Sequence, residues 1–145
     1  MKKVFTILLS LVAVLFAISC DFLIDIPYEK MYEHYLTSAE YEEIYGEIVS
    51  YEGAVVKVKI ATEKTKNFSS GATVSFEFFG DIKDLNEIEL GSEIKFVIES
   101  CYFYNGHVLP MVALECNEKA ILDFENGKAN LIAFYKRKVE QQNHN

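Results

Sequence analysis

The sequence has little positive charge and few of the residue patterns that usually carry catalysis. Its 145 residues include 14 lysines and arginines against 22 aspartates and glutamates, which gives a formal net charge of −8. A chain this acidic gains nothing from a phosphate backbone, so we expect no nucleic-acid partner. The Gly-x-Ser-x-Gly nucleophile motif and glycine-rich phosphate-binding loops are missing. We therefore expect a protein that is not an enzyme and has no cofactor.

Histidine is scarce as well, and the three copies are His34, His107 and His144. None has a neighbour at zinc-ligand spacing, so we expect no metal site. His34 lies among acids and is expected to pair with one of them in solvent, while His107 is expected to be an exposed hairpin residue. Asp81 and Asp84 could contact calcium, although capping of a short helix explains them without an ion.

The first residues have the organisation of a secretory signal peptide. Lys2 and Lys3 form a short positive segment, and an uncharged run follows over residues 4–19. The run is too short for a spanning helix, and polar chain follows it closely. Positive charge, an apolar stretch and small residues in this order are typical of export signals. The sequence therefore predicts a protein that leaves the cytoplasm.

The end of this signal carries a second pattern. Leu15-Phe16-Ala17-Ile18-Ser19-Cys20 resembles the bacterial lipobox, although Ala17 stands where leucine is usual. The resemblance implies cleavage after Ser19 and acylation of Cys20, which would anchor the chain in the lipid bilayer. Each buried methylene contributes about 0.8 kcal/mol, so two or three acyl chains hold a protein essentially permanently. The alternative is an ordinary secretion signal that leaves Cys20 in the mature chain.

Cleavage would leave 126 residues and, because two lysines are lost, a net charge of −10. The mature protein would lie on the periplasmic or cell-surface face of a bacterial membrane. Asp21 resembles an inner-membrane retention signal of enteric bacteria, but that rule varies between bacterial groups, so the choice of membrane stays open.

Residues 20–43 should form the lipid anchor, a tether and a short acidic helix. Pro27 suits a first helical position. Apolar residues then follow at helical spacing, namely Tyr28, Met31, Tyr32, Tyr35, Leu36 and Ala39. Thr37 and Glu40 have the spacing of a capping box, which would divide the segment into two short helices. The tyrosine stripe either packs on a core or forms a partner surface.

Residues 44–116 have the alternation of β-strands. The predicted strands are Ile44–Ser50, Ala54–Thr62, Thr73–Phe79, Glu93–Tyr102 and His107–Glu115. A short helix capped by Asp81 is expected before the fourth strand, and Asn105-Gly106 predicts a tight hairpin turn. This β-β-β-α-β-β order, with Leu90-Gly91-Ser92-Glu93-Ile94-Lys95-Phe96 at the start of the fourth strand, resembles the oligonucleotide/oligosaccharide-binding (OB) fold. The resemblance implies a five-stranded Greek-key barrel over about half of the chain. Another small barrel or an open meander is the alternative.

Residues 117–145 form a C-terminal extension, for which two structures are open. Lys128–Gln142 reads as an amphipathic helix with a disordered end beyond it. Its inward residues would be Leu131, Ile132, Tyr135 and Val139. Alternatively, Asn126-Gly127 turns a further hairpin. The cluster Lys136-Arg137-Lys138 is interpreted as cations at a helix C-terminus rather than as a binding site.

The outward residues of the second and third strands are the candidate binding site. They are expected to be Lys57, Lys59, Ser75, Glu77 and Phe79. One exposed aromatic and partly cancelled charges do not make a nucleic-acid groove. The sequence therefore favours a scaffold or protein-binding module that contacts another envelope protein. The alternative is a small-ligand or glycan receptor that uses Lys57, Lys59, Glu77 and Phe79 on the barrel face.

The two remaining cysteines are expected to be separate, buried thiols. If Asn105 and Gly106 are the turn residues, Cys101 lies opposite Pro110 and Cys116 lies opposite Lys95. The two cysteines are then about 20 Å apart along the ladder, at the usual rise of a strand. A disulfide needs Cα atoms within about 7 Å.

Overall fold

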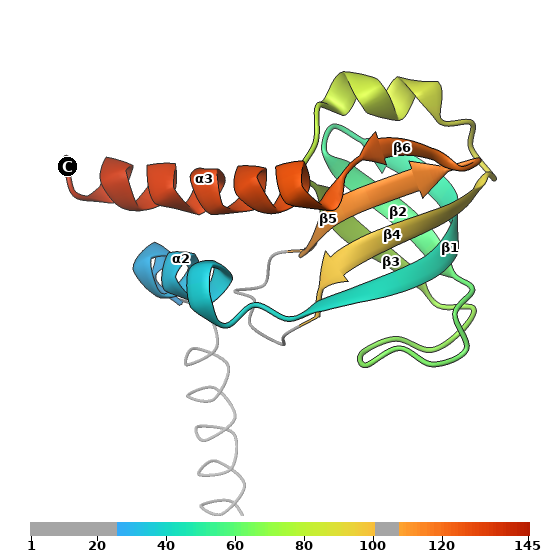
Figure 1. Ribbon diagram of the computed structural model, residues 1–145, viewed down its shortest axis with the longest axis horizontal. Coiled ribbons are helices and arrows are strands. Elements are labelled where there is room, and N and C mark those ends of the chain that lie inside the picture. The colour runs from blue at the N-terminus through green and yellow to red at the C-terminus, as the bar shows by residue number, and fades with distance from the viewer. Residues whose placement is uncertain (1–25, 101–107) are drawn as a thin grey trace, which may run out of the picture.

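The computed structural model describes residues 26–100 and 108–145 (Figure 1). The predicted signal and Cys20, together with Cys101, the Asn105-Gly106 turn and His107, lie outside the described residues. A six-stranded sheet forms the body, and two helices lie side by side next to it. No helix in the described ranges is long and apolar enough to cross a membrane.

The sheet is mainly antiparallel, and its neighbours follow the order β3-β2-β1-β4-β5-β6. The strands are β1 (Tyr41–Glu52), β2 (Val55–Ile60), β3 (Thr73–Phe78), β4 (Glu93–Glu99), β5 (Leu109–Cys116) and β6 (Lys119–Leu122). In addition, β3 pairs in parallel with β5. A 3-10 helix, η1 (Ile82–Glu87), connects β3 to β4, and Asp81 caps it by accepting a hydrogen bond from the Lys83 N–H. The predicted α+β class is confirmed.

The expectation of five strands is wrong by one, because β6 was not predicted. It follows β5 through Asn117 and Glu118, whose φ angles of 51° and 62° are both positive. Two successive positive φ angles are typical of a tight hairpin turn that glycine or asparagine favours. Glutamate at the second position is not typical of such a turn, so the sequence does not predict it. An ion pair from Lys119 to Glu87 then joins β6 to η1.

The predicted register of β4 and β5 is wrong by one residue. Cys116 lies opposite Ile94, and Lys95 lies opposite Glu115. A one-residue shift moves every side chain to the other face, so the buried partners Ile94 and Cys116 must share a face. The register shifts again after Val97, where Ile98 pairs with Met111. Cys116 is nevertheless a free and buried thiol, as expected.

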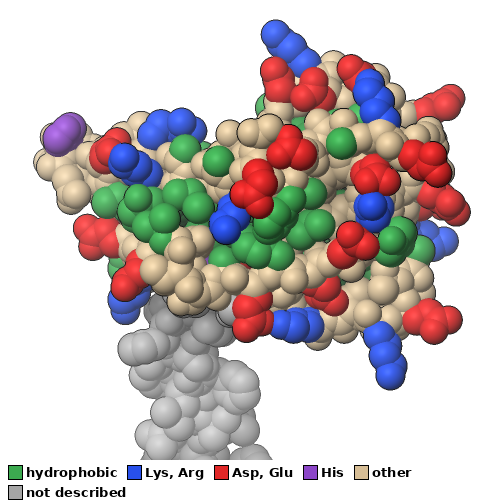
Figure 2. Space-filling view, in the orientation of Figure 1, with side chains coloured by type: hydrophobic (Ala, Val, Ile, Leu, Met, Phe, Trp, Pro, Cys, Tyr) green, Lys and Arg blue, Asp and Glu red, His purple; other side chains and the backbone are tan. Residues whose placement is uncertain are grey.

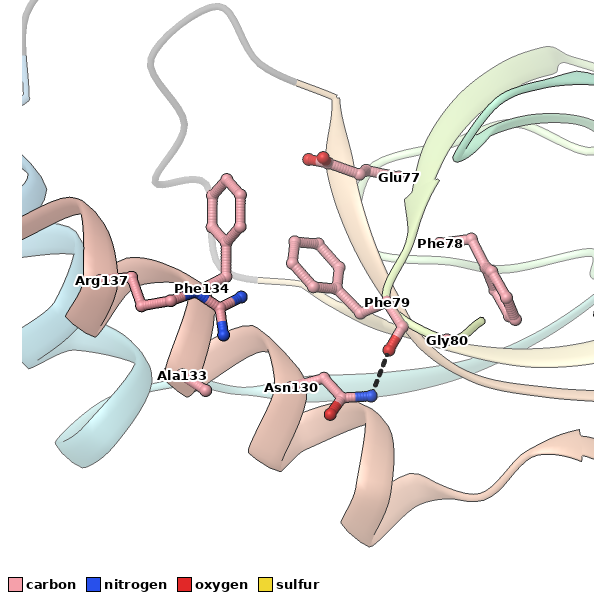
Figure 3. A pocket seen from close by; sticks show the side chains of 8 residues that line it. All are labelled: Glu77, Phe78, Phe79, Gly80, Asn130, Ala133, Phe134 and Arg137. Carbon is pink, nitrogen blue, oxygen red and sulfur yellow. Dashed lines mark hydrogen bonds between the residues drawn. The ribbon is translucent and has the colours of Figure 1, made fainter. Parts of the chain in front are cut away.

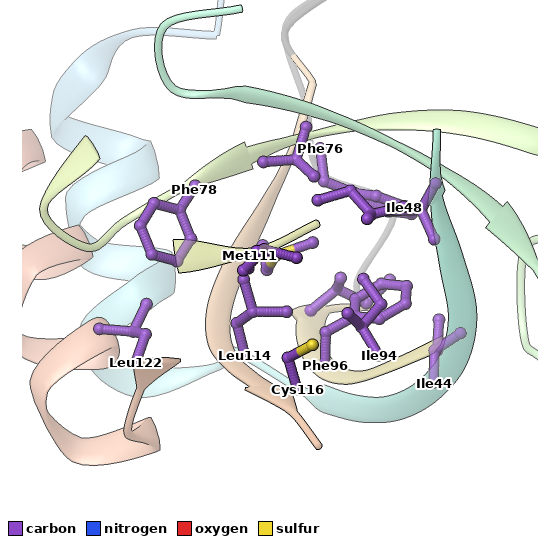
Figure 4. Close-up of a cluster of buried hydrophobic side chains, with 14 of the residues drawn as sticks. Ile44, Ile48, Phe76, Phe78, Ile94, Phe96, Met111, Leu114, Cys116 and Leu122 are labelled. Carbon is purple, nitrogen blue, oxygen red and sulfur yellow. The ribbon is translucent and has the colours of Figure 1, made fainter. Parts of the chain in front are cut away.

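The core lies between the inner faces of the strands, and its residues alternate as predicted (Figure 4). On β2, Val56 and Val58 are fully buried between exposed neighbours. Phe76 of β3 and Phe96 of β4 meet at the centre, with ring centroids 5.2 Å apart. Period-two alternation is the signal that a half-buried strand imposes, and it located most of this core correctly.

The first helix, α2 (Tyr28–Thr37), follows Pro27 as the sequence predicts. The capping box at Thr37 and Glu40 is not formed: the Thr37 hydroxyl donates to the Glu33 carbonyl, and the chain leaves the helix at Ser38. The stretch is therefore one helix followed directly by β1. The Thr37 hydroxyl therefore bonds back to the last turn of α2, and the residues after Ser38 enter β1, so no second helix follows for it to cap.

The last helix, α3 (Phe124–Gln142), settles the alternative at the C-terminus. Asp123 caps it by accepting a hydrogen bond from the Asn126 N–H, so Asn126-Gly127 lies in its first turn rather than in a hairpin. Leu131 and Tyr135 are buried, as predicted for the inward face. Tyr135 packs against Tyr35 of α2, with centroids 4.9 Å apart.

The two helices form a second apolar cluster on the outside of the sheet. Its fully enclosed members are Met31, Tyr35, Phe79, Val112, Leu131 and Tyr135. The tyrosine stripe of α2 therefore contributes to a core, at least through Tyr35. Because this cluster joins the ends of β3 and β5 to α3, it decides which side chains of β3 reach solvent.

Candidate functional site

Four of the predicted outward residues, Lys57, Lys59, Ser75 and Glu77, lie on one outward face of β2 and β3. Lys57 is opposite Ser75, and Val55 is opposite Glu77, so these side chains share the side away from the core. Lys57 and Lys59 are exposed, as the alternation predicts. Lys59 is also opposite Glu47 of β1, so its charge has an acidic neighbour.

Contrary to the prediction, Phe79 does not lie on this exposed face. Its side chain is only 8% exposed and belongs to the cluster between the sheet and the helices. The Phe79 N–H donates to the Met111 carbonyl, and its ring meets Phe134 of α3 edge to face at 5.7 Å. The error arose because the sequence does not say that α3 covers the end of β3. A covering helix converts an outward strand position into a buried one.

A cavity of about 280 Å³ opens where α3 passes the end of β3 (Figure 3). We call it the aromatic pocket; its lining residues are Glu77, Phe78, Phe79, Gly80, Asn130, Ala133, Phe134 and Arg137. Two predicted site residues, Glu77 and Phe79, are brought together here. The other two, Lys57 and Lys59, are not part of the lining.

The side chains from α3 are positioned by specific contacts. The Asn130 amide donates to the Phe79 carbonyl at 2.8 Å, which ties the helix to the last residue of the β3 segment. The Lys138 ammonium lies 5.3 Å from the centroid of the Phe134 ring, a cation–π distance. The pocket thus combines flat aromatic surface with hydrogen-bond donors on Arg137 and acceptors on Glu77.

Sequence reasoning missed Asn130, Phe134 and Arg137 as site residues. Their spacing of four and three positions along α3 places them on one side of the helix, which is the signal that could have found them. The sequence assigns Arg137, with Lys136 and Lys138, to a helix C-terminus; this assignment is wrong, because α3 continues to Gln142 and its last turn contains no basic residue. Among the described residues there is no group of three or more His, Cys, Asp and Glu side chains that could hold a metal ion.

A buried contact between a histidine and a carboxylate lies between α2 and the end of β4. The His34 Nε2 atom is 3.1 Å from a carboxylate oxygen of Glu99, and the Glu99 side chain is fully buried. The same carboxylate oxygen accepts a hydrogen bond from the Glu40 N–H at 3.3 Å. The expectation that His34 pairs in solvent is therefore wrong, because α2 folds over β4 and encloses the pair.

Two tyrosines near the Glu99 carboxylate have raised pKa values. Burial is the larger cause for Tyr41, and the nearby Glu99 carboxylate adds to it; together they raise the pKa of Tyr41 to about 12. Burial also raises the pKa of Tyr35 far above its usual range, with smaller contributions from Tyr135 and Glu99. Both effects disfavour a phenolate beside an existing negative charge. Both phenols are therefore protonated at neutral pH in the folded protein.

No protein-family model matches the chain, and neither do any curated protein or any solved structure. The fold and the site define an α+β domain with an outward strand face and an adjoining aromatic pocket.

Proposed function

We propose that the protein is a lipid-anchored bacterial envelope protein whose OB-like domain binds another envelope protein. The lipobox-like junction Ser19-Cys20 supports the anchor. Helix α2 begins at Tyr28, so only seven residues separate it from Cys20. Seven extended residues span about 25 Å at most, which would keep the domain close to the membrane surface.

The strand pairings support an OB-like barrel as the architecture of this domain. β1 pairs with β2 and β4, β3 pairs with β2 and β5, and β4 pairs with β5. Following these pairs leads from β1 through β2, β3, β5 and β4 back to β1. An open meander would not contain the parallel β3–β5 pairing, so this contact favours the OB-like alternative.

The observation that carries protein binding is the exposure of three large apolar side chains along the outer side of β1 and β2. Tyr45 is 51% exposed, Val49 43% and Val55 39%. They stand among charged residues, as at a protein interface, where apolar anchors are surrounded by a polar rim. The β1–β2 connection contains only Gly53 and Ala54 between the strands. A loop this short leaves little cleft for an extended ligand, which also favours a protein surface as partner.

The anchor is tested by replacing Cys20 with serine. The Cys20→Ser protein should leave the membrane fraction and appear in the soluble envelope fraction, because a serine hydroxyl does not receive the lipid. Cys116→Ala is the matched control and should stay membrane-bound. Recovery of Cys20→Ser protein with membranes after a high-pH wash would contradict the lipobox interpretation.

Protein binding is tested by crosslinking the anchored protein in its native host, followed by mass spectrometry. One reproducible protein partner supports the proposal. A heat-stable small molecule that co-purifies would instead support a ligand receptor. That second function is favoured by the aromatic pocket, where ring surface from Phe79 and Phe134 meets the guanidinium of Arg137.

A further inference from the structure

A second hollow lies on the outer face of the sheet, away from the aromatic pocket. We call it the sheet groove; it has a volume of about 280 Å³ and crosses β4, β5 and β6. Its floor contains Val97 and Ala113, which lie directly opposite each other, and Ala120 of β6. Outward positions of a half-buried sheet are usually polar. Three apolar ones in neighbouring strands are therefore a departure from the rule, and the small alanines create the hollow.

One end of the groove is closed by the start of α3. Leu122 and Phe124 line this end, and the Phe124 ring is held edge to face against Tyr41 at 5.0 Å. Hydrophobic side chains gather in the middle of this face, over β4 and β5, with charged side chains beside them (Figure 2).

The rim of the groove is predominantly acidic. Its charged side chains are Glu43, Glu115, Asp123 and Lys95, three carboxylates and one ammonium. Lys95 is already paired with Glu115, at 2.9 Å. Glu43 accepts a hydrogen bond from the Tyr45 hydroxyl, which is neutral and adds no positive charge to the rim. The rim therefore carries an excess of two negative charges.

The titration behaviour of the rim agrees with this excess. The hydrogen bond to Glu115 is the main reason that the pKa of Lys95 is raised, and Glu43 contributes to the same direction. Hydrogen bonds from Asn126 lower the pKa of Asp123, which keeps that carboxylate ionised at neutral pH. The Lys95 shift indicates neighbouring carboxylates, whereas the Asp123 shift reflects the hydrogen-bond donors of the helix cap, so only Lys95 reports the acidic character of the rim.

We propose that the sheet groove binds a basic segment of the partner protein, in which an apolar side chain is flanked by lysine or arginine. This inference rests on the proposed function, since it names the surface and the chemistry of a protein partner. The apolar side chain fills the hollow over Val97 and Ala113, and the flanking cations meet Glu43 and Asp123. A chain with a net charge of −8 also attracts basic partners at long range.

The test measures binding of a fluorescein-labelled peptide of alternating lysine and leucine to the full chain carrying Cys20→Ser. We expect binding that weakens as salt is raised, because exposed charges are screened. The corresponding glutamate–leucine peptide should not bind, and a lysine–serine peptide should bind much less tightly. Equal binding of the acidic peptide, or absence of binding by the basic one, overturns the inference.

Variants then locate the site. Ala113→Leu fills the groove without adding charge and should weaken the lysine–leucine peptide about tenfold. Glu43→Gln should weaken it less and reduce the salt dependence. The matched controls are Ser75→Leu on the β2–β3 face and Glu63→Gln in the β2–β3 loop, neither of which should change the affinity. Equal effects of Ala113→Leu and Ser75→Leu would show that the peptide binds without regard to the groove.

A photo-crosslinking amino acid separates this inference from the proposed function. Placed at position 113 of the anchored protein in its host, it should capture a protein; placed at position 63, an exposed position of the β2–β3 loop, it should not. Capture only from position 63 would retain protein binding and overturn the groove as its site. Failure at both positions, together with an absence of any partner in the general crosslinking experiment, would contradict both proposals.

Discussion

Gly127 shows how a single residue fixes the contact between α3 and the sheet. A Cβ atom added there would lie 1.8 Å from the carbonyl oxygen of Val112. Helix propensity alone favours alanine over glycine by about 1 kcal/mol, so Gly127 destabilises the helix by this amount. The close contact between α3 and β5 must offset that loss. The close approach lets the start of α3 lie directly on the bulged segment of β5.

Gly127→Ala should therefore destabilise the protein despite its better helix propensity. Backbone cannot move aside as a side chain can, so the helix must lift from β5; overpacking typically costs about 1–3 kcal/mol. Urea unfolding followed by circular dichroism measures the change. Lys136→Ala, at an exposed position of the same helix, should leave the free energy of unfolding nearly unchanged. A stabilised Gly127→Ala protein would contradict the observed approach.

Asp123 is the second residue on which α3 depends. Hydrogen bonds from Asn126 lower the pKa of this carboxylate below its usual value in the unfolded chain. A lowered pKa in the folded state contributes stability that is present above the unfolded pKa and is lost as the pH falls through the folded pKa.

Replacement of Asp123 by asparagine should remove this pH dependence while keeping the cap, since asparagine also accepts the bond. The measurement is unfolding at neutral pH and at pH values below the ordinary aspartate range. We expect the variant to lose less stability between the two conditions than the parent chain. Glu125→Gln, at an exposed position of the same helix turn, is the control; an equal change in both variants would contradict the assignment to Asp123.

At the scale of elements, the strands were predictable because burial of one face enforces alternation. Val56 and Val58, or Ile94 and Phe96, are visible as core residues in the sequence alone. The turn at Asn117-Glu118 was not predictable, because the second of its two positive φ angles falls on glutamate, a residue type that rarely adopts one. The burial of Phe79 was hidden as well, since it depends on where α3 packs. The role of Glu77 and Phe79 in binding stays a prediction.

The pairing of α2 with α3 also depends on protonated tyrosines. Burial raises the pKa of Tyr135 to about 12 and that of Tyr41 to about 12, against 10.0 for an ordinary tyrosine. Below pH 10, a phenol whose pKa is raised in the folded state makes its full contribution to the stability of the fold. As the pH rises from about 10 towards 12, the unfolded chain releases these protons first, so stability falls.

We therefore expect alkaline unfolding that begins above pH 10 and starts at the helix pair. Phenolate absorbance should rise in a late, cooperative step together with the loss of helical circular dichroism. Tyr135→Phe should reduce the steepness of the loss, whereas Tyr45→Phe, at a half-exposed position on β1, should not. Complete titration of all tyrosines near pH 10 with the helices intact would contradict the buried environment.

At the scale of the whole molecule, charge and the burial of Phe79 argue against a nucleic-acid partner for the proposed OB-like domain. Binding of single strands needs a basic groove with aromatic platforms on which bases stack. Lys59 lies opposite Glu47, and the aromatic expected on this face, Phe79, is buried. The predicted mature charge of −10 adds repulsion over the entire surface.

The full chain carrying Cys20→Ser should thus leave the fluorescence anisotropy of a labelled polythymidine strand unchanged at physiological salt. A variant with Glu47→Lys and Glu77→Lys, which makes the β2–β3 face basic, should bind weakly and in a salt-dependent way, because it gains the electrostatic term but no stacking surface. Micromolar, salt-sensitive binding of the strand by the unaltered protein would contradict the prediction that its charge prevents nucleic-acid binding.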